Sequence, residues 1–303
     1  MRPNFLIIGA QKSASTFVQN CVREHPEAFL PRYETPFFED PYYHSYEIED
    51  LESLFRNASN MKALGIKRPD YLAKSEVPKR IHKHLPDAKF IVVLRNPVDR
   101  AISAYYWYMQ TGDLPIKSPE QGLQEILKGD YKTRYPKADQ IIDYGFYHQH
   151  LTRYFNFFDK KRFLILFHRD FQTDPLKSIK KVYKFLQIDG NFFPNSLLKR
   201  PKQSIYSLFR IKWHSIAIRK FFYSYIYVKP NSIIKIPSKS ALRRSIYYCF
   251  IAFDRLFLKQ IFDNTKPELS NHLLHSLTQV YLEDISKLTD SLDIDLIAWK
   301  NHS

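Results

Sequence analysis

Glycine and cysteine are both scarce in this chain of 303 residues. Seven glycines are too few for a collagen-like repeat or for a phosphate-binding loop built mainly of glycine. The two cysteines, Cys21 and Cys249, lie far apart in the sequence, so they provide neither a disulfide framework nor a ligand set for structural zinc. A reducing compartment is the environment that suits such a chain best.

Long apolar runs are also missing. The chain begins MRPNFLIIGAQKSAS and soon turns polar, which leaves too short a run for a signal-peptide core or a membrane span. Hydrophobic residues nevertheless make up 44% of the sequence and charged residues 25%, a composition that excludes disorder and supplies a sizeable core. We therefore expect a globular, cytoplasmic protein.

Acidic residues are few relative to basic ones, 31 against 46, and the resulting charge of +15 is of the kind found in nucleic-acid-binding proteins. The excess is uneven, however. Residues 199–262 hold fourteen Lys and Arg and the single acid Asp254, so this segment carries +13 and the rest of the chain only +2. The basic character therefore belongs to one segment.

The first 190 residues alternate short apolar runs with amphipathic stretches, the pattern of a parallel sheet covered by helices. Strands are predicted at residues 4–9, 62–67, 89–94 and 162–167, of which the third is the most apolar and is expected to be central. Helices are predicted after the first strand, around residues 77–85, from Pro97 to about Met109, and over residues 140–158 and 175–186. Residues 111–139 predict a long loop with one short helix.

We expect a single domain over residues 1–303. Its parts are an α/β core (1–198), a basic, aromatic helical segment (199–262) and a C-terminal helix (263–303). In that last helix, one apolar stripe is predicted, formed by Leu269, Leu273, Leu277, Val280, Ile285 and Leu288.

The loop after the first strand has the composition of an anion site. Residues 9–16 (GAQKSAST) lie between a strand and a helix, where free backbone N–H groups and the helix dipole attract an anion. Small residues let the backbone approach a phosphate, and Lys12 adds a charge. The Walker A pattern does not fit, because Lys12 follows Gly9 by three positions instead of six. Taken alone, the loop could equally be an ordinary strand-to-helix turn.

Arg95 favours the phosphate interpretation. It follows the third predicted strand, at the edge where open α/β sheets bind ligands, and Ser103 lies eight residues further on, inside the next helix. Without the loop, Arg95 and Arg100 would be interpreted as solvated charges at a helix start. With the loop, they predict a nucleotide site.

The two segments, GAQKSASTF and RNPVDRAISAYYWY, resemble the nucleotide-binding signatures of the sulfotransferase family. Such enzymes transfer a sulfonyl group from 3′-phosphoadenosine 5′-phosphosulfate (PAPS) to a hydroxyl or an amine. Further segments resemble elements of the carbohydrate sulfotransferases, in the same order: YETPFFED, GIKRPDY, GFY with HLTRY, and DFQTDP. Together they cover roughly residues 4–190, and residues 267–299 resemble the end of bacterial members. The resemblance implies a P-loop-like, three-layer α/β fold with a helical C-terminal part.

The resemblance also implies two sets of site residues. The catalytic set is Glu34 as general base, Lys12 at the bridging oxygen, and Lys67 at the sulfonyl oxygens or beside Glu34. The nucleotide set is Lys12, Ser13, Ala14, Ser15 and Thr16 at the 5′-phosphate, with Arg95 and Ser103 at the 3′-phosphate. The co-substrate is PAPS, and the chemistry needs no metal.

Some residues depart from the family pattern. Ala14 stands where a glycine is usual, and we expect a helix-like φ there, because a positive φ would strain alanine. His168 and Arg169 replace a Tyr-Glu pair, which puts the acceptor side or the local packing in doubt. His82 and His84 are interpreted as structural or exposed residues and not as the base.

Residues 205–262 combine fourteen aromatic side chains with eleven Lys and Arg. One interpretation is a set of helices with a solvated basic face. Another is peripheral contact with an anionic membrane, since basic and interfacial aromatic side chains suit such a surface. Nucleic acid is the least favoured partner and is not expected.

These observations predict a PAPS-dependent sulfotransferase that acts on a hydroxyl, or an amine, of a glycan or glycolipid, in the cytoplasm or at the inner face of the membrane. The carbohydrate preference depends on YETPFFED and GIKRPDY alone. One alternative is a P-loop kinase of a small molecule, which the Walker A mismatch disfavours. The other is a non-enzymatic basic protein that binds membrane or nucleic acid.

Overall fold

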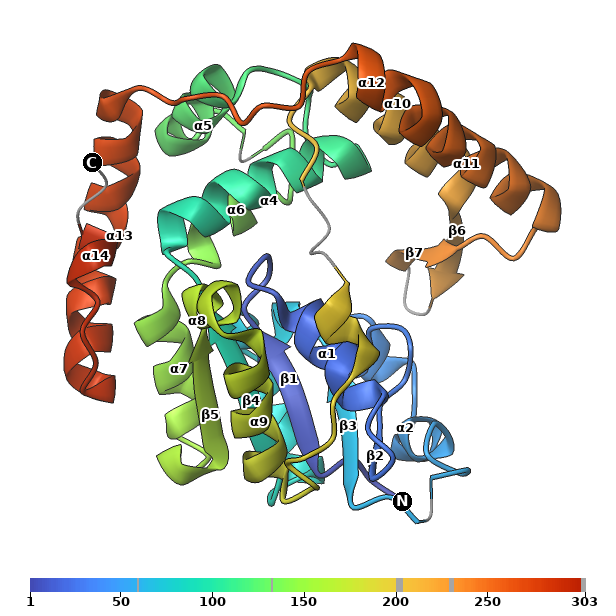
Figure 1. The fold of residues 1–303 in the computed structure, drawn as a ribbon, viewed down its shortest axis with the longest axis vertical. Helices are drawn as coiled ribbons and strands as arrows, with labels where there is room; N and C mark the ends of the chain where they lie inside the picture. The colour runs from blue at the N-terminus through green and yellow to red at the C-terminus, as the bar shows by residue number, and fades with distance from the viewer. Residues whose placement is uncertain (59, 132, 200–203, 229–231, 301–303) are drawn as a thin grey trace. The chain divides into compact units, whose positions relative to one another are not determined.

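The structure is a computed structural model that describes the chain except residues 59, 132, 200–203, 229–231 and 301–303. The chain divides into two compact units (Figure 1). The core unit comprises residues 1–96, 146–202 and 290–292, and the helical unit comprises the remainder. The expected single domain stays a prediction.

A five-stranded parallel sheet organises the core unit, in the order β2-β3-β1-β4-β5. The strands are β1 (Phe5–Gly9), β2 (Ala28–Phe29), β3 (Ala63–Lys67), β4 (Lys89–Leu94) and β5 (Phe163–Phe167). Four of them confirm the predicted strands to within one residue at each end. β4 is internal, as expected, although β1 takes the middle place.

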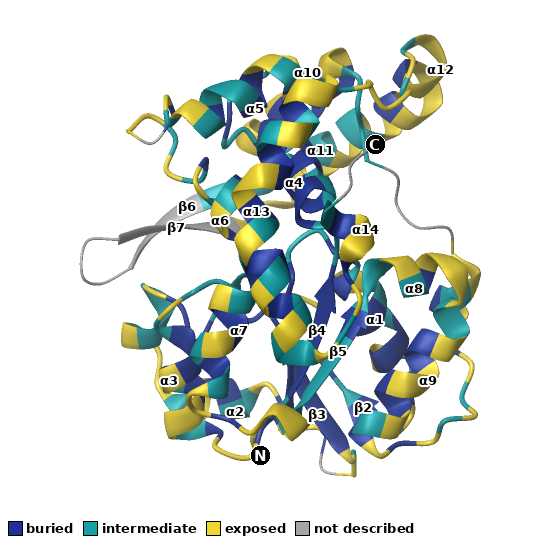
Figure 2. Ribbon diagram, turned by 90° about the vertical axis from the view of Figure 1, so that its left-hand side faces the viewer, coloured by how far each residue is buried: buried dark blue, intermediate teal, exposed yellow. Residues whose placement is uncertain are grey.

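Helices cover both faces of this sheet, so the core unit has three layers (Figure 2). On one face lie α1 (Ser15–Arg23), α8 (His168–Thr173) and α9 (Pro175–Leu186), whose apolar side chains join those of β1, β4 and β5 in one buried cluster. On the other face lie α3 (Val77–His84) and α7 (Tyr147–Phe155), where Phe90 of β4 packs against Tyr154. The predicted α/β class is confirmed.

Shorter segments complete the core unit. They are α2 (Ile48–Ser53) and the 3-10 helices η1 (Tyr42–His44), η2 (Pro69–Leu72), η3 (Lys160–Arg162) and η4 (Asn195–Leu198).

The prediction of one continuous helix over residues 140–158 is wrong. The structure has α6 (Gln140–Asp143) in the helical unit and α7 in the core unit, with Gly145 between them. Within the helical unit, a Cβ at Gly145 would lie 2.6 Å from the ring of Tyr281, whose hydroxyl donates to the carbonyl oxygen of Ile142 at 3.0 Å. Glycine lets that ring approach, and it also weakens the helix at this point.

The helical unit contains α4 (Pro97–Thr111), α5 (Pro119–Lys128), α10 (Leu208–Ala217), α11 (Ala241–Phe253), α12 (Lys259–Ile261), α13 (Asn271–Leu292) and α14 (Ile297–Lys300), with the last three residues of α13 in the core unit. Two π-helical turns, η5 (Ile218–Phe222) and η6 (Asp254–Leu258), follow α10 and α11. The long α4 and the single short α5 agree with the prediction.

Two details of this unit differ from the sequence-based expectation. Residues 199–262 are not helical throughout, because β6 (Tyr223–Val228) and β7 (Ser232–Pro237) form an antiparallel hairpin. Both stretches are rich in β-branched or aromatic residues, a composition that favours strands. In α13, Tyr281 is buried and Val280 is exposed, so the buried stripe of this helix includes Tyr281 in place of Val280.

The single acid of the basic segment has a structural position. Arg210 on α10 donates to both carboxylate oxygens of Asp254, at 2.7 and 2.9 Å, and His214 lies 3.0 Å from the same carboxylate. Burial raises the pKa of Asp254, but its hydrogen bonds with Arg210 and His214 outweigh burial and lower the pKa overall. Asp254 therefore joins α10 to the turn that follows α11.

Candidate active site

The loop between β1 and α1 is held in a conformation that alanine rarely adopts. Lys12 has a φ of 68° and Ala14 a φ of 74°, both in the left-handed region. The expectation of a helix-like φ at Ala14 is therefore wrong. Ala14 is the residue that precedes α1, and its carbonyl accepts from the N–H groups of Phe17 and Val18. The chain thus turns sharply before the helix starts, at a conformational cost of about 1–2 kcal/mol for a residue other than glycine.

Ser13 lies in the same loop and carries a polar atom without a partner. The residue is fully buried, and its Oγ makes no hydrogen bond with any residue that the structure describes. An unsatisfied buried hydroxyl costs about 1–3 kcal/mol, which a ligand that accepts its proton would recover. A phosphate oxygen beside the start of a helix is such a ligand. The loop residues therefore fit the phosphate of the expected nucleotide.

Arg95 lies at the C-terminal end of β4, beside this loop. Its guanidinium donates from Nη1 to the carbonyl oxygen of Lys12 at 3.2 Å. Ser103, the other residue predicted at the 3′-phosphate, belongs to α4 of the helical unit. The core unit thus brings Arg95 to the loop, whereas its pairing with Ser103 stays a prediction.

Lys67 and Glu34 meet beside the same loop. Lys67 ends β3 and is only 3% exposed, and its Nζ donates to Oε1 of Glu34 at 3.0 Å and to Oγ1 of Thr16 at 2.8 Å. Three residues that the sequence predicted for two different roles are therefore connected by one ammonium group. Glu34 keeps access to solvent, with 39% of its side chain exposed.

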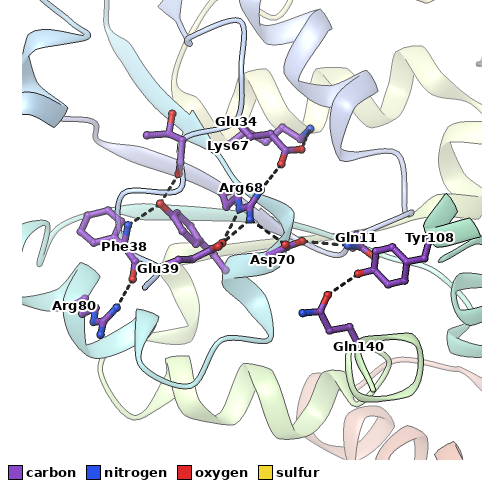
Figure 3. Close-up of polar contacts among 12 residues, drawn as sticks. Gln11, Glu34, Phe38, Glu39, Lys67, Arg68, Asp70, Arg80, Tyr108 and Gln140 are labelled. Atoms are coloured by element: carbon purple, nitrogen blue, oxygen red, sulfur yellow. Dashed lines mark hydrogen bonds and ion pairs between the residues drawn. The ribbon is translucent and has the colours of Figure 1, made fainter. Parts of the chain in front are cut away.

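Arg68 is a site residue that the sequence analysis missed (Figure 3). Its Nη1 donates to Glu34 at 2.9 Å, its Nε and Nη2 donate to Glu39 at 2.6 and 2.8 Å, and Nη2 lies 3.1 Å from Asp70. Asp70 in turn accepts from the side chain of Gln11 at 3.3 Å. Arg68 lies in the GIKRPDY segment, next to Lys67. Its position beside a predicted site residue is the sequence signal that could have identified it.

The two glutamates around Arg68 differ in acidity. Burial raises the pKa of Glu34, but attraction to Lys67 and Arg68, with their hydrogen bonds, outweighs burial and lowers the pKa overall. For Glu39, burial is stronger than the contacts with Arg68, and the pKa is raised. Glu34 is therefore ionised near neutral pH, as a group that accepts a proton must be.

Two buried tyrosines hold the backbone segment that carries Glu34. The Tyr71 hydroxyl donates to the carbonyl oxygen of Thr35 and accepts from the N–H of Phe38 at 3.0 Å, so it holds the segment that carries Glu34. Tyr154 on α7 donates to the carbonyl oxygen of Tyr71 at 2.9 Å. Both tyrosines are fully buried, so the position of Glu34 depends on the packed core.

His82 contacts the rings of Phe157 and Phe158, away from this cluster. This contact agrees with the interpretation of His82 as a structural or exposed residue.

A parallel α/β sheet, a loop after its first strand that fits a phosphate and an ionised carboxylate beside that loop are features of nucleotide-dependent group-transfer proteins. The chain belongs to the sulfotransferase family: residues 2–213 match its sulfotransferase domain.

Curated relatives include two human proteins. The chain is 30% identical over 200 residues to bifunctional heparan sulfate N-deacetylase/N-sulfotransferase 2, a match that covers 61% of this chain and 22% of that protein. It is 29% identical over 202 residues to heparan sulfate glucosamine 3-O-sulfotransferase 6, which covers 64% of this chain and 56% of that protein. The chain therefore spans about a fifth and about half of these relatives.

Solved structures show the same fold. A sulfotransferase from Alicyclobacillus acidocaldarius superposes with a TM-score of 0.70 and 20% identity, over 99% of this chain and all of that one. A mouse sulfotransferase in complex with PAP, the desulfated form of PAPS, superposes with a TM-score of 0.50 and 17% identity, over 93% of this chain and 84% of that one. The P-loop-like α/β class is thereby confirmed.

Among the described residues, no group of three or more His, Cys, Asp or Glu side chains could hold a metal ion. Among the same residues, no helix has the length and the apolar character needed to cross a bilayer.

Proposed function

We propose that this protein transfers a sulfonyl group from PAPS to a hydroxyl, or an amine, of a glycan or glycolipid. The observation that carries the proposal is the pair of hydrogen bonds from Lys67, one to Thr16 of the anion-binding loop and one to Glu34. The donor loop and the base are thereby kept beside each other, as an in-line transfer requires. The names of the curated relatives support a carbohydrate acceptor.

The site residues have separate roles in nucleotide binding and proton transfer. When bound, PAPS supplies the sulfonyl group and a good leaving group. Lys12 and the buried hydroxyl of Ser13 bind the 5′ side, and Arg95 with Ser103 binds the 3′-phosphate. Glu34 accepts the proton of the attacking hydroxyl at its carboxylate.

Lys67 and Arg68 have a separate task. Both are cations in contact with Glu34, so they keep it ionised and fix its orientation. The Lys67 ammonium has three N–H donors, of which described residues use two. The third remains for a sulfonyl oxygen, where it would offset the charge that develops during transfer.

Calorimetry with PAP tests the nucleotide assignment. We expect Arg95→Ala to weaken PAP binding by about 2–3 kcal/mol, the value of a charge-assisted phosphate contact. Arg162→Ala is the matched control, because Arg162 pairs with Asp87 at the opposite end of the sheet. A protein that binds PAP no better than 5′-AMP would contradict the nucleotide assignment, and one that prefers ATP would support the kinase alternative.

Transfer of labelled sulfate tests the acceptor. A panel of glycans and glycolipids, incubated with PAPS and the full chain, should yield a labelled product whose sulfate is released by acid hydrolysis. Absence of transfer to every member of the panel, with PAP binding intact, would argue against a carbohydrate acceptor.

We also propose that residues 205–262 contact an anionic membrane surface from the cytoplasmic side. No residue of α11 is buried, and Leu242 and Tyr248 on this helix are 71% and 63% exposed. Leu256 and Ile261, which follow, are 60% and 70% exposed. Exposed apolar side chains in a segment of high positive charge suit the interface of an anionic bilayer.

Vesicle sedimentation tests this contact. We expect binding to anionic vesicles that weakens as added salt shortens the Debye length. The variant should replace four exposed basic residues with Ser, namely Lys220, Arg244, Arg255 and Lys259. Arg243 is kept, because its side chain donates to the backbone carbonyls of Lys220 and Tyr223. The control replaces four exposed lysines of the core unit, Lys79, Lys83, Lys180 and Lys181. Equal binding to neutral vesicles, or equal loss in both variants, would refute the contact, and cell fractionation tests the location separately.

A further inference from the structure

The guanidinium of Arg68 lies between the proposed base and two other carboxylates (Figure 3). Its Nε and Nη2 donate to the two carboxylate oxygens of Glu39, at 2.6 and 2.8 Å, and Nη2 lies 3.1 Å from Asp70. Its Nη1 donates to Oε2 of Glu34 at 2.9 Å. A bidentate pair of this kind fixes the plane of the guanidinium. Glu39 therefore orients Arg68 so that Nη1 faces the base.

The two oxygens of the Glu34 carboxylate have different neighbours. Oε1 accepts from Lys67, which is only 3% exposed, whereas Oε2 accepts from Arg68, whose side chain is 23% exposed. An acceptor that arrives from solvent therefore meets the carboxylate on the side of Oε2. The nitrogen beside that oxygen is Nη1 of Arg68.

Nη1 has a donor to spare at this place. A guanidinium Nη carries two N–H groups, and Glu34 accepts one of the two on Nη1. Within the described part of the chain, no second residue accepts from Nη1. An atom that donates to Oε2 lies next to this nitrogen and can accept its second N–H.

A hydroxyl group satisfies both contacts during the attack, and an amine does not. A hydroxyl oxygen has two lone pairs, so one attacks sulfur while the other accepts from Nη1. An amine nitrogen has a single lone pair, which the attack consumes, so its own N–H groups would face the N–H of Arg68. A protonated amine would in addition bring a third positive charge beside Lys67 and Arg68. Both effects leave a donor unsatisfied or oppose like charges, which disfavours the amine.

We infer that Arg68 contacts the attacking oxygen of the acceptor and selects hydroxyl groups over amines. The inference rests on the proposed function and narrows its acceptor to one class. In the transfer, a lone pair of the hydroxyl oxygen forms the new O–S bond and the hydroxyl proton goes to Oε2 of Glu34. The S–O bond to the 5′-phosphate breaks, and PAP leaves with its electron pair. Arg68 keeps all its protons throughout, and Glu39 acts through it as a positioning residue.

A single probe that offers both groups tests the selection. The probe is an oligosaccharide of alternating uronic acid and glucosamine with free amino groups, incubated with labelled PAPS at a pH at which part of the amino groups is unprotonated. Nitrous acid at low pH releases N-linked sulfate and leaves O-linked sulfate in place. We expect the wild-type protein to favour O-linked label at least about tenfold, the value of one charge-assisted contact. In Arg68→Met this ratio should fall about tenfold, whatever the overall rate.

Arg80→Met is the matched control. Arg80 supports the same segment, since it donates to the carbonyl oxygen of Phe38 at 3.0 Å and pairs with Asp40 at 2.9 Å, and it makes no printed contact with the base. Its ratio of O-linked to N-linked label should equal that of the wild-type protein. Glu39→Gln is a second variant, which weakens the bidentate pair and keeps the test available where Arg68→Met does not fold. Its ratio should fall in the same direction by a smaller factor.

Three results would overturn the inference: predominant N-linked label from the wild-type protein, an unchanged ratio in the Arg68 and Glu39 variants, or an equal fall in Arg80→Met. Failure of the wild-type protein to bind PAP, or to label any member of the glycan panel, would instead contradict the proposed function itself.

Discussion

Lys67 donates one hydrogen bond to Thr16 and another to Glu34, so a single buried ammonium group joins the anion-binding loop to the proposed base. The lysine is only 3% exposed, which means that water screens these contacts poorly. We therefore expect a ligand that engages the loop to alter the surroundings of the proposed base without touching it.

Replacement of the base should separate catalysis from binding. We expect Glu34→Gln to retain its fold and its affinity for PAP but to lose about 10²–10⁴ in turnover, the usual contribution of a positioned general base. Steady-state transfer rates and calorimetry with PAP measure the two effects. Glu49→Gln, at an exposed position on α2, is the control and should behave as wild type. Near-normal turnover of Glu34→Gln would assign the proton to another group.

The pH dependence should report the cations around Glu34. Its pKa lies below the ordinary glutamate value of 4.5, so kcat/KM should fall on the acid side only as the pH drops below that value. Lys67→Met removes a cation and leaves burial, which raises the pKa, so the acid limb should move to higher pH. Residual activity measured from pH 4 to 8 checks this shift, with Lys79→Met, an exposed lysine of α3, as control. An unchanged limb would mean that Lys67 does not set the acidity of the base.

The same ion pair contributes to stability in a defined pH range. Because the folded-state pKa of Glu34 is lowered, its contribution is present above the ordinary glutamate pKa and is lost as the pH falls through the lowered value. In Lys67→Met the folded-state pKa of Glu34 rises toward or above the ordinary value, so this acid-side loss of unfolding free energy should become smaller or disappear. Urea unfolding at several pH values measures it.

The buried hydroxyl of Ser13 predicts opposite effects on stability and binding. Its Oγ has no partner among the described residues, so Ser13→Ala should leave thermal stability unchanged or raise it by about 1 kcal/mol. Affinity for PAP should fall, by about fivefold to tenfold, because one donor to the phosphate is lost. Ser45→Ala should show the reverse pattern, since that hydroxyl donates to the carbonyl oxygen of Pro41 at 2.9 Å. A Ser13→Ala protein that loses stability while keeping its affinity would contradict the assignment.

Much of the core unit could be predicted from the sequence, because its strands are short, apolar and bounded by polar turns. The anion loop, Glu34 and Lys67 were also identifiable, since their segments resemble family elements. Arg68 was not, because its neighbours in the sequence give no sign of the two carboxylates, Glu34 and Glu39, that another segment brings to it. The β6–β7 hairpin was missed because charge and aromatic content dominated the interpretation of residues 199–262. The positive φ of Ala14 was not predicted either, because amino-acid composition does not determine backbone dihedral angles.

Ala14 offers a test of how much strain the anion loop stores. With a φ of 74°, alanine here costs about 1–2 kcal/mol relative to the right-handed region, and Ala14→Gly removes that cost. Glycine also widens the unfolded ensemble, which costs about 0.4–1 kcal/mol, so the expected net gain in unfolding free energy lies between about 0 and about 1.6 kcal/mol. Ala73→Gly is the matched control, because Ala73 has a φ of −91° and should lose about 0.5–1 kcal/mol. Urea unfolding of both variants, with PAP absent, measures the difference. Equal losses in the two variants would mean that neighbouring contacts hold the loop and that the dihedral angle at Ala14 carries no strain.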